Sequence, residues 1–172
     1  MSDERFTYRV AIITASDTAY TGGREDLSGK AVRDMVQEHG YTVKSYLVLP
    51  DERRMLREEL RRLCDEQRAD LILTTGGTGL SPRDVTPEAT LDIAQRQAPG
   101  IAEAMRMNSL AVTGRAMLSR GVAATRGRTL IINLPGSPKA VRENLSYVLP
   151  QLDHALDILT GRDSECGAQI ND

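Results

Sequence analysis

The hydrophobic pattern of the chain alternates between short apolar runs and amphipathic stretches. Apolar or β-branched runs of strand length predict strands at residues 8–15, 42–49, 71–75, 121–126 and 129–134. Apolar positions at helical spacing predict helices at residues 28–40, 52–68 and 101–110, others beginning at residues 86 and 137, and a last one at residues 149–159. Strand and helix alternate three times, which favours a mostly parallel sheet between layers of helices.

Individual residues mark where several of these helices begin and end. Ser28 and Asp51 are the predicted N-caps of the first two helices, and Gly40 is the predicted left-handed residue that ends the first. Thr86 and Pro87 are the predicted N-cap and first residue of the third helix. Each helix therefore begins shortly after a strand, as in βαβ units.

The last two predicted strands are separated only by Gly127 and Arg128, and a two-residue connection predicts a hairpin. The predicted fold is thus a three-layer α/β/α sandwich whose mostly parallel sheet contains one antiparallel hairpin pair. A length of 172 residues suits one domain. We expect that domain to span residues 1–161, followed by a loose polar tail at residues 162–172.

Composition and charge argue against several classes of protein. The net charge is −2 and aromatic residues make up 3% of the chain, so a dedicated nucleic-acid binder is disfavoured. No apolar run approaches the roughly 20 residues that cross a membrane, and the first residues do not form a signal peptide. We therefore expect a cytoplasmic protein. Cys64, Cys166, His39 and His154 have neither zinc-site spacing nor the partners of an acyl-transfer triad.

A glycine-rich loop, TTGGTG, follows the third predicted strand at residues 74–79. Glycines allow successive backbone N–H groups to face one anion, and Thr74, Thr75 and Thr78 add hydroxyl donors. The loop matches neither the dinucleotide fingerprint nor the phosphate-binding loop of nucleotide hydrolases. A phosphate or carboxylate cradle and a simple tight turn are equally compatible with it.

Three carboxylates follow the first three predicted strands, at Asp17, Asp51 and Asp84. Two of them have ordinary alternative roles, as the N-cap suggested for Asp51 and as a turn residue for Asp84. The carboxyl ends of parallel strands meet at one sheet edge, which places these acids near the glycine loop. Two or three acids beside an anion cradle predict a Mg²⁺ ion that binds a phosphate ligand.

The loop of residues 133–139, NLPGSPK, ends the last strand and begins a helix. Its backbone N–H groups, Ser137 and Lys139 could receive an anion, although an ordinary Ser-Pro helix start explains the same residues. Ser119 and Arg120 place another cation near a strand end. Four loops with anion-binding character at one sheet edge are more informative than any one of them.

These motifs together resemble the Mog/MoaB family of molybdenum cofactor biosynthesis proteins. The resemblance rests on TTGGTG and SPRDVTPEAT at residues 74–90, LSR at residues 118–120, and NLPGSPKAV at residues 133–141. It extends over most of residues 8–159 and implies a three-layer α/β/α fold that forms homotrimers. Members bind molybdopterin, a pterin dithiolene with a terminal phosphate. Active members use magnesium ATP to adenylylate that phosphate, and they release pyrophosphate.

The resemblance also assigns roles to residues of this chain. Asp51 and Asp84 are implied as the catalytic acids and Mg²⁺ ligands. It also implies that Gly76 to Gly79, Ser119 and Pro135 to Ser137 line the molybdopterin pocket. Together with the loop residues considered above, the candidate substrate-binding residues are Ser16, Asp17, Thr75, Gly76, Gly77, Thr78, Gly79, Ser119, Arg120, Pro135, Gly136, Ser137 and Lys139.

Two alternatives to an adenylyltransferase remain. The loop of residues 18–26 fits the family only at its edges, and some MoaB relatives have no settled catalytic role. The protein could therefore be a non-catalytic molybdopterin carrier or scaffold. It could also be an unrelated phosphate-binding enzyme on the same fold. Either an adenylyltransferase or a non-catalytic carrier could hand its bound molecule to a molybdenum-inserting protein.

Overall fold

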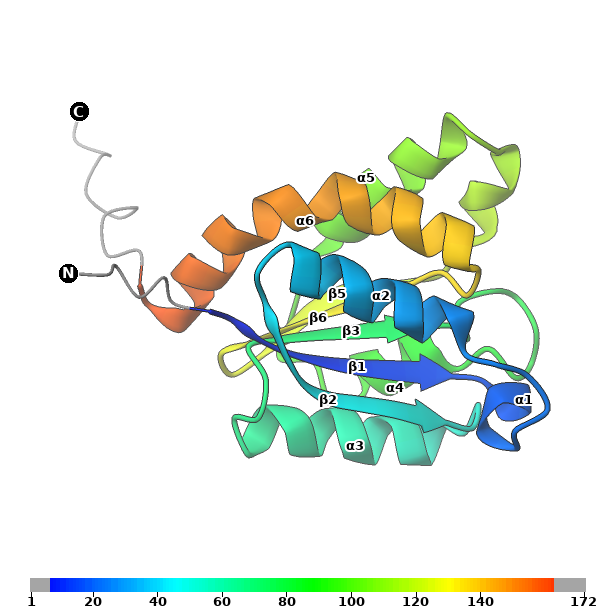
Figure 1. The fold of residues 1–172 in the computed structure, drawn as a ribbon, viewed down its shortest axis with the longest axis horizontal. Helices are drawn as coiled ribbons and strands as arrows, with labels where there is room; N and C mark the ends of the chain where they lie inside the picture. Colours follow the sequence, from blue (N-terminus) through cyan, green and yellow to red (C-terminus); the bar gives the residue numbers. More distant parts are fainter. Residues whose placement is uncertain (1–6, 163–172) are drawn as a thin grey trace.

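The computed structural model describes residues 7–162 (Figure 1). The strands are β1 (Arg9–Ala15), β2 (Thr42–Leu49), β3 (Leu71–Thr75), β4 (Arg96–Gln97), β5 (Ala123–Arg126) and β6 (Thr129–Leu134). The helices are α1 (Asp17–Tyr20), α2 (Leu27–Glu38), α3 (Arg53–Asp65), α4 (Thr86–Leu91), α5 (Pro99–Leu110), the 3-10 helix η1 (Gly114–Leu118) and α6 (Pro138–Thr160). Cys166 and the predicted tail beyond Arg162 lie outside the described residues.

The six strands form one mixed sheet in the order β2-β1-β3-β6-β5-β4. β2, β1, β3 and β6 are parallel, whereas β5 pairs antiparallel with both β6 and the two-residue strand β4. The predicted α/β class, the mostly parallel sheet and the antiparallel hairpin are confirmed. β4 was not predicted, because two exposed residues carry no hydrophobic pattern. Helices α2, α5 and α6 cover one face of the sheet, and α3 and α4 cover the other (Figure 1).

Burial on both faces explains the nearly continuous apolar runs of the central strands. Along β1, Val10 and Ile12 pack under α2 and α6, while Ala11 and Ile13 pack against α3. Every residue of β3 is buried. Within residues 7–162 no helix is long and apolar enough to cross a membrane.

Helix α6 corrects one prediction. The expected separate helices beginning at residue 137 and spanning residues 149–159 are a single helix of 23 residues with Pro150 inside it. Proline normally costs a helix interior about 3 kcal/mol. Pro150 is exposed, while Leu145, Leu149 and Leu152 on the other side are buried in the core. Burial of this continuous apolar face outweighs the local cost, and the helix ends at Gly161, which has left-handed backbone angles.

Three predicted N-caps are also wrong. Val85, without a side-chain bond, occupies the N-cap position of α4, so Thr86 is the first residue of that helix. Asp26 caps α2 by accepting a 2.9 Å hydrogen bond from the Gly29 N–H, whereas the Ser28 hydroxyl donates to the Gly136 carbonyl at 2.6 Å. Glu52 occupies the N-cap position of α3 without a side-chain bond, which leaves Asp51 outside the helix. The tertiary partner of Ser28 lies far away in the sequence, so local capping rules could not identify it.

Asp26 connects α2 to two strands. Its Oδ2 atom accepts hydrogen bonds from the hydroxyls of Thr14 on β1 and Tyr46 on β2, both at 2.6 Å. A side chain at Gly29 would collide with this group of oxygens, so the close approach of the helix requires glycine. Asp26 therefore fixes the start of α2 above the strand ends.

Replacement of Asp26 should destabilise the fold. We expect Asp26→Ala to lower the free energy of unfolding by about 2 kcal/mol, because the helix loses its cap and two hydroxyls lose their acceptor. Urea denaturation measures the loss. Asp34→Ala, at an exposed position of α2 whose partner is the neighbouring Arg33, is the matched control and should change stability little. Equal losses in the two variants would contradict this role for Asp26.

Candidate active site

Two cavities open where the parallel strands end. The strand register pairs Ala15 with Leu49, Thr14 with Thr75, and Thr75 with Leu134, so the loops after these four strands start at one level. The larger cavity, of about 630 Å³, lies over the ends of β1, β2 and β3. The smaller one, of about 290 Å³, lies between β6, α5, η1 and α6.

The larger cavity is lined by five carboxylates and is called the acidic cavity below. These carboxylates belong to Asp17, Glu25, Asp26, Asp51 and Asp84. Among the described residues that line this cavity, Arg24 is the only cation. Most of the predicted site residues meet here, namely Ser16, Asp17, Asp51, Thr75, Gly76, Gly77, Asp84, Gly136 and Ser137.

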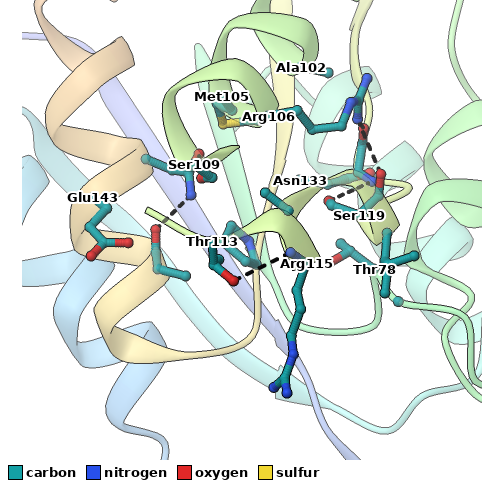
Figure 2. A pocket seen from close by; sticks show the side chains of 17 residues that line it. Thr78, Ala102, Met105, Arg106, Ser109, Thr113, Arg115, Ser119, Asn133 and Glu143 are labelled. Carbon is teal, nitrogen blue, oxygen red and sulfur yellow. Dashed lines mark hydrogen bonds between the residues drawn. The ribbon is translucent and has the colours of Figure 1, made fainter. Parts of the chain in front are cut away.

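The smaller cavity, called the α5 cavity below, has a more apolar lining that includes Ala102, Met105 and Leu118 (Figure 2). Four predicted site residues line it, namely Thr78, Gly79, Ser119 and Pro135. The glycine loop thus contributes its first half to the acidic cavity and its second half to the α5 cavity. The loop after β6 is also shared between the two, which makes these two loops the wall between the cavities.

Two predicted site residues line neither cavity. The Arg120 guanidinium donates to the carbonyl oxygens of Gly79 and Asp84 and forms an ion pair with Glu88. Arg120 therefore braces the glycine loop from outside. Lys139 is exposed, and its ammonium lies 3.7 Å from Glu143 in the next turn of α6. In this structure neither cation faces the space where a substrate anion would bind.

The glycine loop passes so close to other loops that side chains are excluded. Gly76 has a φ of +90°, and a Cβ atom there would clash with the carbonyl oxygen of Ala15. Gly77 has a φ of +65°, and a Cβ atom would collide with the hydroxyl of Thr86 and lie 3.2 Å from Asp51 Oδ1. Among the described residues, that Thr86 hydroxyl is the one buried side-chain polar atom without a hydrogen-bond partner.

Asp51 is held by a reciprocal pair of hydrogen bonds with Asp17. The Asp17 N–H donates to Asp51 Oδ2, and the Asp51 N–H donates to Asp17 Oδ1, each at 2.9 Å. Burial raises the pKa of Asp51 above its ordinary value, and the charges of Asp17 and Asp84 raise it further despite the Asp17 N–H bond. A site that concentrates negative charge in this way favours a bound cation.

Asp84 combines a turn role with a place in the cavity. Its Oδ2 atom accepts from the Ser81 N–H at 2.9 Å, and its own N–H donates to the Ser81 carbonyl at 2.9 Å. The carboxylate lies against Gly79, where a Cβ atom would come within 2.8 Å of Oδ2. In the described part of the chain, no three acidic, histidine or cysteine side chains are close enough to enclose a metal by themselves.

Comparison with known proteins identifies the family. The family model described as "Probable molybdopterin binding domain" matches residues 11–154. The chain belongs to this molybdopterin-binding family. The molybdopterin adenylyltransferase of Helicobacter pylori (strain J99) is 43% identical over 157 residues, which are 90% of this chain and 89% of that protein. The Escherichia coli (strain K12) molybdopterin adenylyltransferase is 40% identical over 83% of this chain and 74% of its own length.

Solved structures of relatives agree with the fold. The molybdopterin biosynthesis enzyme MoaB from Thermus thermophilus superposes with a TM-score of 0.84 and is 51% identical, covering 90% of this chain and 98% of the relative. The resemblance to the Mog/MoaB family inferred from the sequence is therefore confirmed. The same comparison supports the three-layer architecture. In this chain, both cavities lie at the edge of the sheet where the parallel strands end.

Several cavity residues of this family member escaped sequence reasoning. Arg24 lines the acidic cavity, and Arg106, Thr113 and Arg115 line the α5 cavity (Figure 2). Arg106 donates a 2.8 Å hydrogen bond to the Gly121 carbonyl beside Ser119. No spacing rule distinguishes these residues from ordinary helix and loop positions. Only the packing of η1 against α5 brings Arg106, Thr113 and Arg115 to the cavity over the end of β6.

The glycine loop gives a direct stability test. We expect Gly76→Ala to lower the free energy of unfolding by about 2 kcal/mol or more, because it combines an unfavourable positive φ with a backbone clash. The control, Gly100→Ala, adds a methyl group in open space near the start of α5 and should be neutral or slightly stabilising. Denaturant unfolding measures both changes. A Gly76→Ala protein as stable as the control would refute the close approach.

Proposed function

We propose that the protein is a molybdopterin adenylyltransferase, which transfers the adenylyl group of ATP to the terminal phosphate of molybdopterin and releases pyrophosphate. The observation that carries this proposal is the pair of adjoining cavities divided by the glycine loop and the loop after β6. A reaction between two substrates needs two neighbouring sites that meet at the reacting atoms. The names and identities of the relatives support the same activity.

The chemistry of the two cavities suggests which substrate each accepts. The α5 cavity combines apolar walls with the polar side chains of Ser109, Asn133 and Asn144, which suits a flat pterin with polar edges. The acidic cavity contains Arg24 and the carboxylates that suit a magnesium-bound triphosphate. The phosphate of molybdopterin would then meet the α-phosphorus of ATP beside residues 76–79.

The residues present fit a magnesium ion. Mg²⁺ prefers oxygen ligands and commonly combines one or two carboxylates with substrate phosphates, so it needs no protein cage. Asp51 and Asp84 offer carboxylate oxygens to one cavity, and the raised pKa of Asp51, caused by burial and neighbouring acids, indicates that negative charge there lacks compensation. When bound, Mg²⁺ supplies charge neutralisation for the phosphates.

The protein itself would supply positioning and electrostatics in this reaction. A phosphate oxygen of molybdopterin forms the new bond to the α-phosphorus while the bond to the β-phosphate bridge breaks, so no protein nucleophile is required. Cys64 agrees with that view. It is one of the buried residues of α3, and burial raises the pKa of its thiol to about 11, so it remains protonated and unreactive near neutral pH.

Loss of Asp84 should abolish turnover. We expect Asp84→Asn to reduce molybdopterin-dependent pyrophosphate release from ATP by at least about 100-fold, because a ligand of the phosphate-bound cation is lost. Asp92→Asn is the control, since Asp92 lies at the end of α4, pairs with Arg53 and lines neither cavity. Wild-type protein that releases no pyrophosphate under conditions where a known enzyme works would refute the activity.

A non-catalytic molybdopterin carrier is the alternative function. The loop of residues 18–26, which fits the family poorly in the sequence, borders the acidic cavity and so affects the proposed nucleotide site more than the pterin site. A carrier would retain molybdopterin, would not turn over ATP and would be insensitive to Asp84→Asn.

We further propose that the protein acts in the cytoplasm as a homotrimer and passes its product to a molybdenum-inserting protein. Support for a trimer comes from the Mog/MoaB resemblance and from large apolar side chains on the outside of α5 and η1, where Met107 is 72% and Met117 67% exposed. Light scattering should give three times the 18.9 kDa mass of one chain. A monomeric mass at micromolar concentration would contradict the assembly.

A further inference from the structure

Arg83 connects the three loops that carry the acids of the acidic cavity. Its Nε and Nη2 atoms donate to Asp17 Oδ2 and Oδ1, both at 3.0 Å, in a bidentate pair with the loop after β1. Its two Nη atoms also lie 3.3 Å from Glu52 Oε1 in the loop after β2. Arg83 itself belongs to the loop after β3 and directly precedes Asp84. One guanidinium therefore spans all three strand ends.

This arrangement occupies the carboxylate of Asp17. Oδ1 accepts from both Arg83 and the Asp51 N–H, and Oδ2 accepts from Arg83. Arg83 holds the pKa of Asp17 below its ordinary value, with help from the Asp51 N–H, so Asp17 stays ionised. Asp17 was predicted to bind substrate, but its oxygens already have protein partners in this structure.

The consequence for Asp51 is a fixed orientation. The Asp17 N–H holds Asp51 Oδ2 at 2.9 Å, while Oδ1 lies against Gly77 on the wall of the acidic cavity. Within the described residues, no protein donor forms a hydrogen bond to Oδ1. Because the Asp17 segment is itself held by Arg83, the direction of this free oxygen depends on a residue that does not touch it.

We propose that Arg83 and Asp17 are positioning residues that aim Asp51 Oδ1 into the acidic cavity. This inference rests on the proposed function, since it concerns the geometry of the cation and nucleotide site. Arginine suits the task because its planar guanidinium binds two acceptors in a fixed fork, which the single ammonium group of lysine cannot do. The Arg83 side chain is 53% exposed, so solvent screens the ion pairs and their effect should appear in geometry more than in stability.

The test compares Arg83→Ala, Arg83→Lys and Asp17→Asn with wild type. Arg126→Ala is the matched control, because Arg126 forms a similar bidentate pair with Asp65 between α3 and β5 and lines neither cavity. Three properties are measured on the full chain, namely the affinity for Mn²⁺ alone by electron paramagnetic resonance, the amide hydrogen exchange of Asp17 and Asp51, and the separate kcat and KM values for adenylylation.

We expect Arg83→Ala to weaken Mn²⁺ binding and to lower kcat by about 10- to 100-fold, the range typical of residues that orient metal ligands. The KM for molybdopterin should stay within about twofold of wild type, because the α5 cavity is untouched. The amides of Asp17 and Asp51 should exchange about tenfold faster. Arg83→Lys should recover part of each property, and Asp17→Asn should resemble Arg83→Ala without further loss in the double variant.

Arg126→Ala should leave Mn²⁺ affinity and kcat unchanged even if it lowers the unfolding midpoint. A folded Arg83→Ala protein with wild-type Mn²⁺ affinity, kcat and amide exchange would overturn the inference. So would a variant that raises the KM for ATP at unchanged kcat, since Arg83 would then be a direct substrate contact. If wild-type protein shows no adenylylation, the proposed function fails, but Mn²⁺ binding and amide exchange still decide whether Arg83 and Asp17 position Asp51.

Discussion

The shared level at which the parallel strands end is the constraint on which the site depends. Because Ala15 lies level with Leu49, and Thr75 with Leu134, four loops meet within the width of the sheet. That proximity requires Gly76 to pass directly against the Ala15 carbonyl and Gly77 to pass against Thr86. It also allows Arg83 to reach two other loops with one side chain. The cavities, the acids and the wall between them all follow from this alignment.

Charge at the site shows how a nearly neutral protein can be suited to phosphate chemistry. Burial and the neighbouring acids raise the pKa of Asp51, so the site holds like charges together at a cost to the folded state. The basic groups nearby serve mainly as braces. Arg120 holds the glycine loop through Gly79 and Asp84, and Arg83 holds Asp17. In the proposed reaction, attraction of phosphates would therefore fall to backbone N–H groups, to Arg24 and to a bound cation.

The correct and the incorrect predictions from the sequence have a common physical cause. Strand β3 was predicted with its observed bounds, since burial on both faces leaves an apolar run that local pattern reveals. The N-caps predicted at Ser28 and Asp51 were wrong, because both side chains form hydrogen bonds with residues distant in the sequence and do not cap the helices that follow them. The continuity of α6 through Pro150 was missed for the same reason, since packing against the sheet overrides local propensity.

The sequence by itself determined the order of the five longer strands and of most of the long helices, the chemical character of the four loops and, through its motifs, the family. Those properties can be inferred from short segments of the sequence without knowing which residues lie beside them in the folded protein. Only the tertiary structure decided which residues face which cavity. It divided the glycine loop at Gly77 and Thr78, turned Arg120 away from both cavities and joined Asp17 to Arg83. Such contacts join residues distant in sequence, and no local pattern encodes the direction of a side chain across loops.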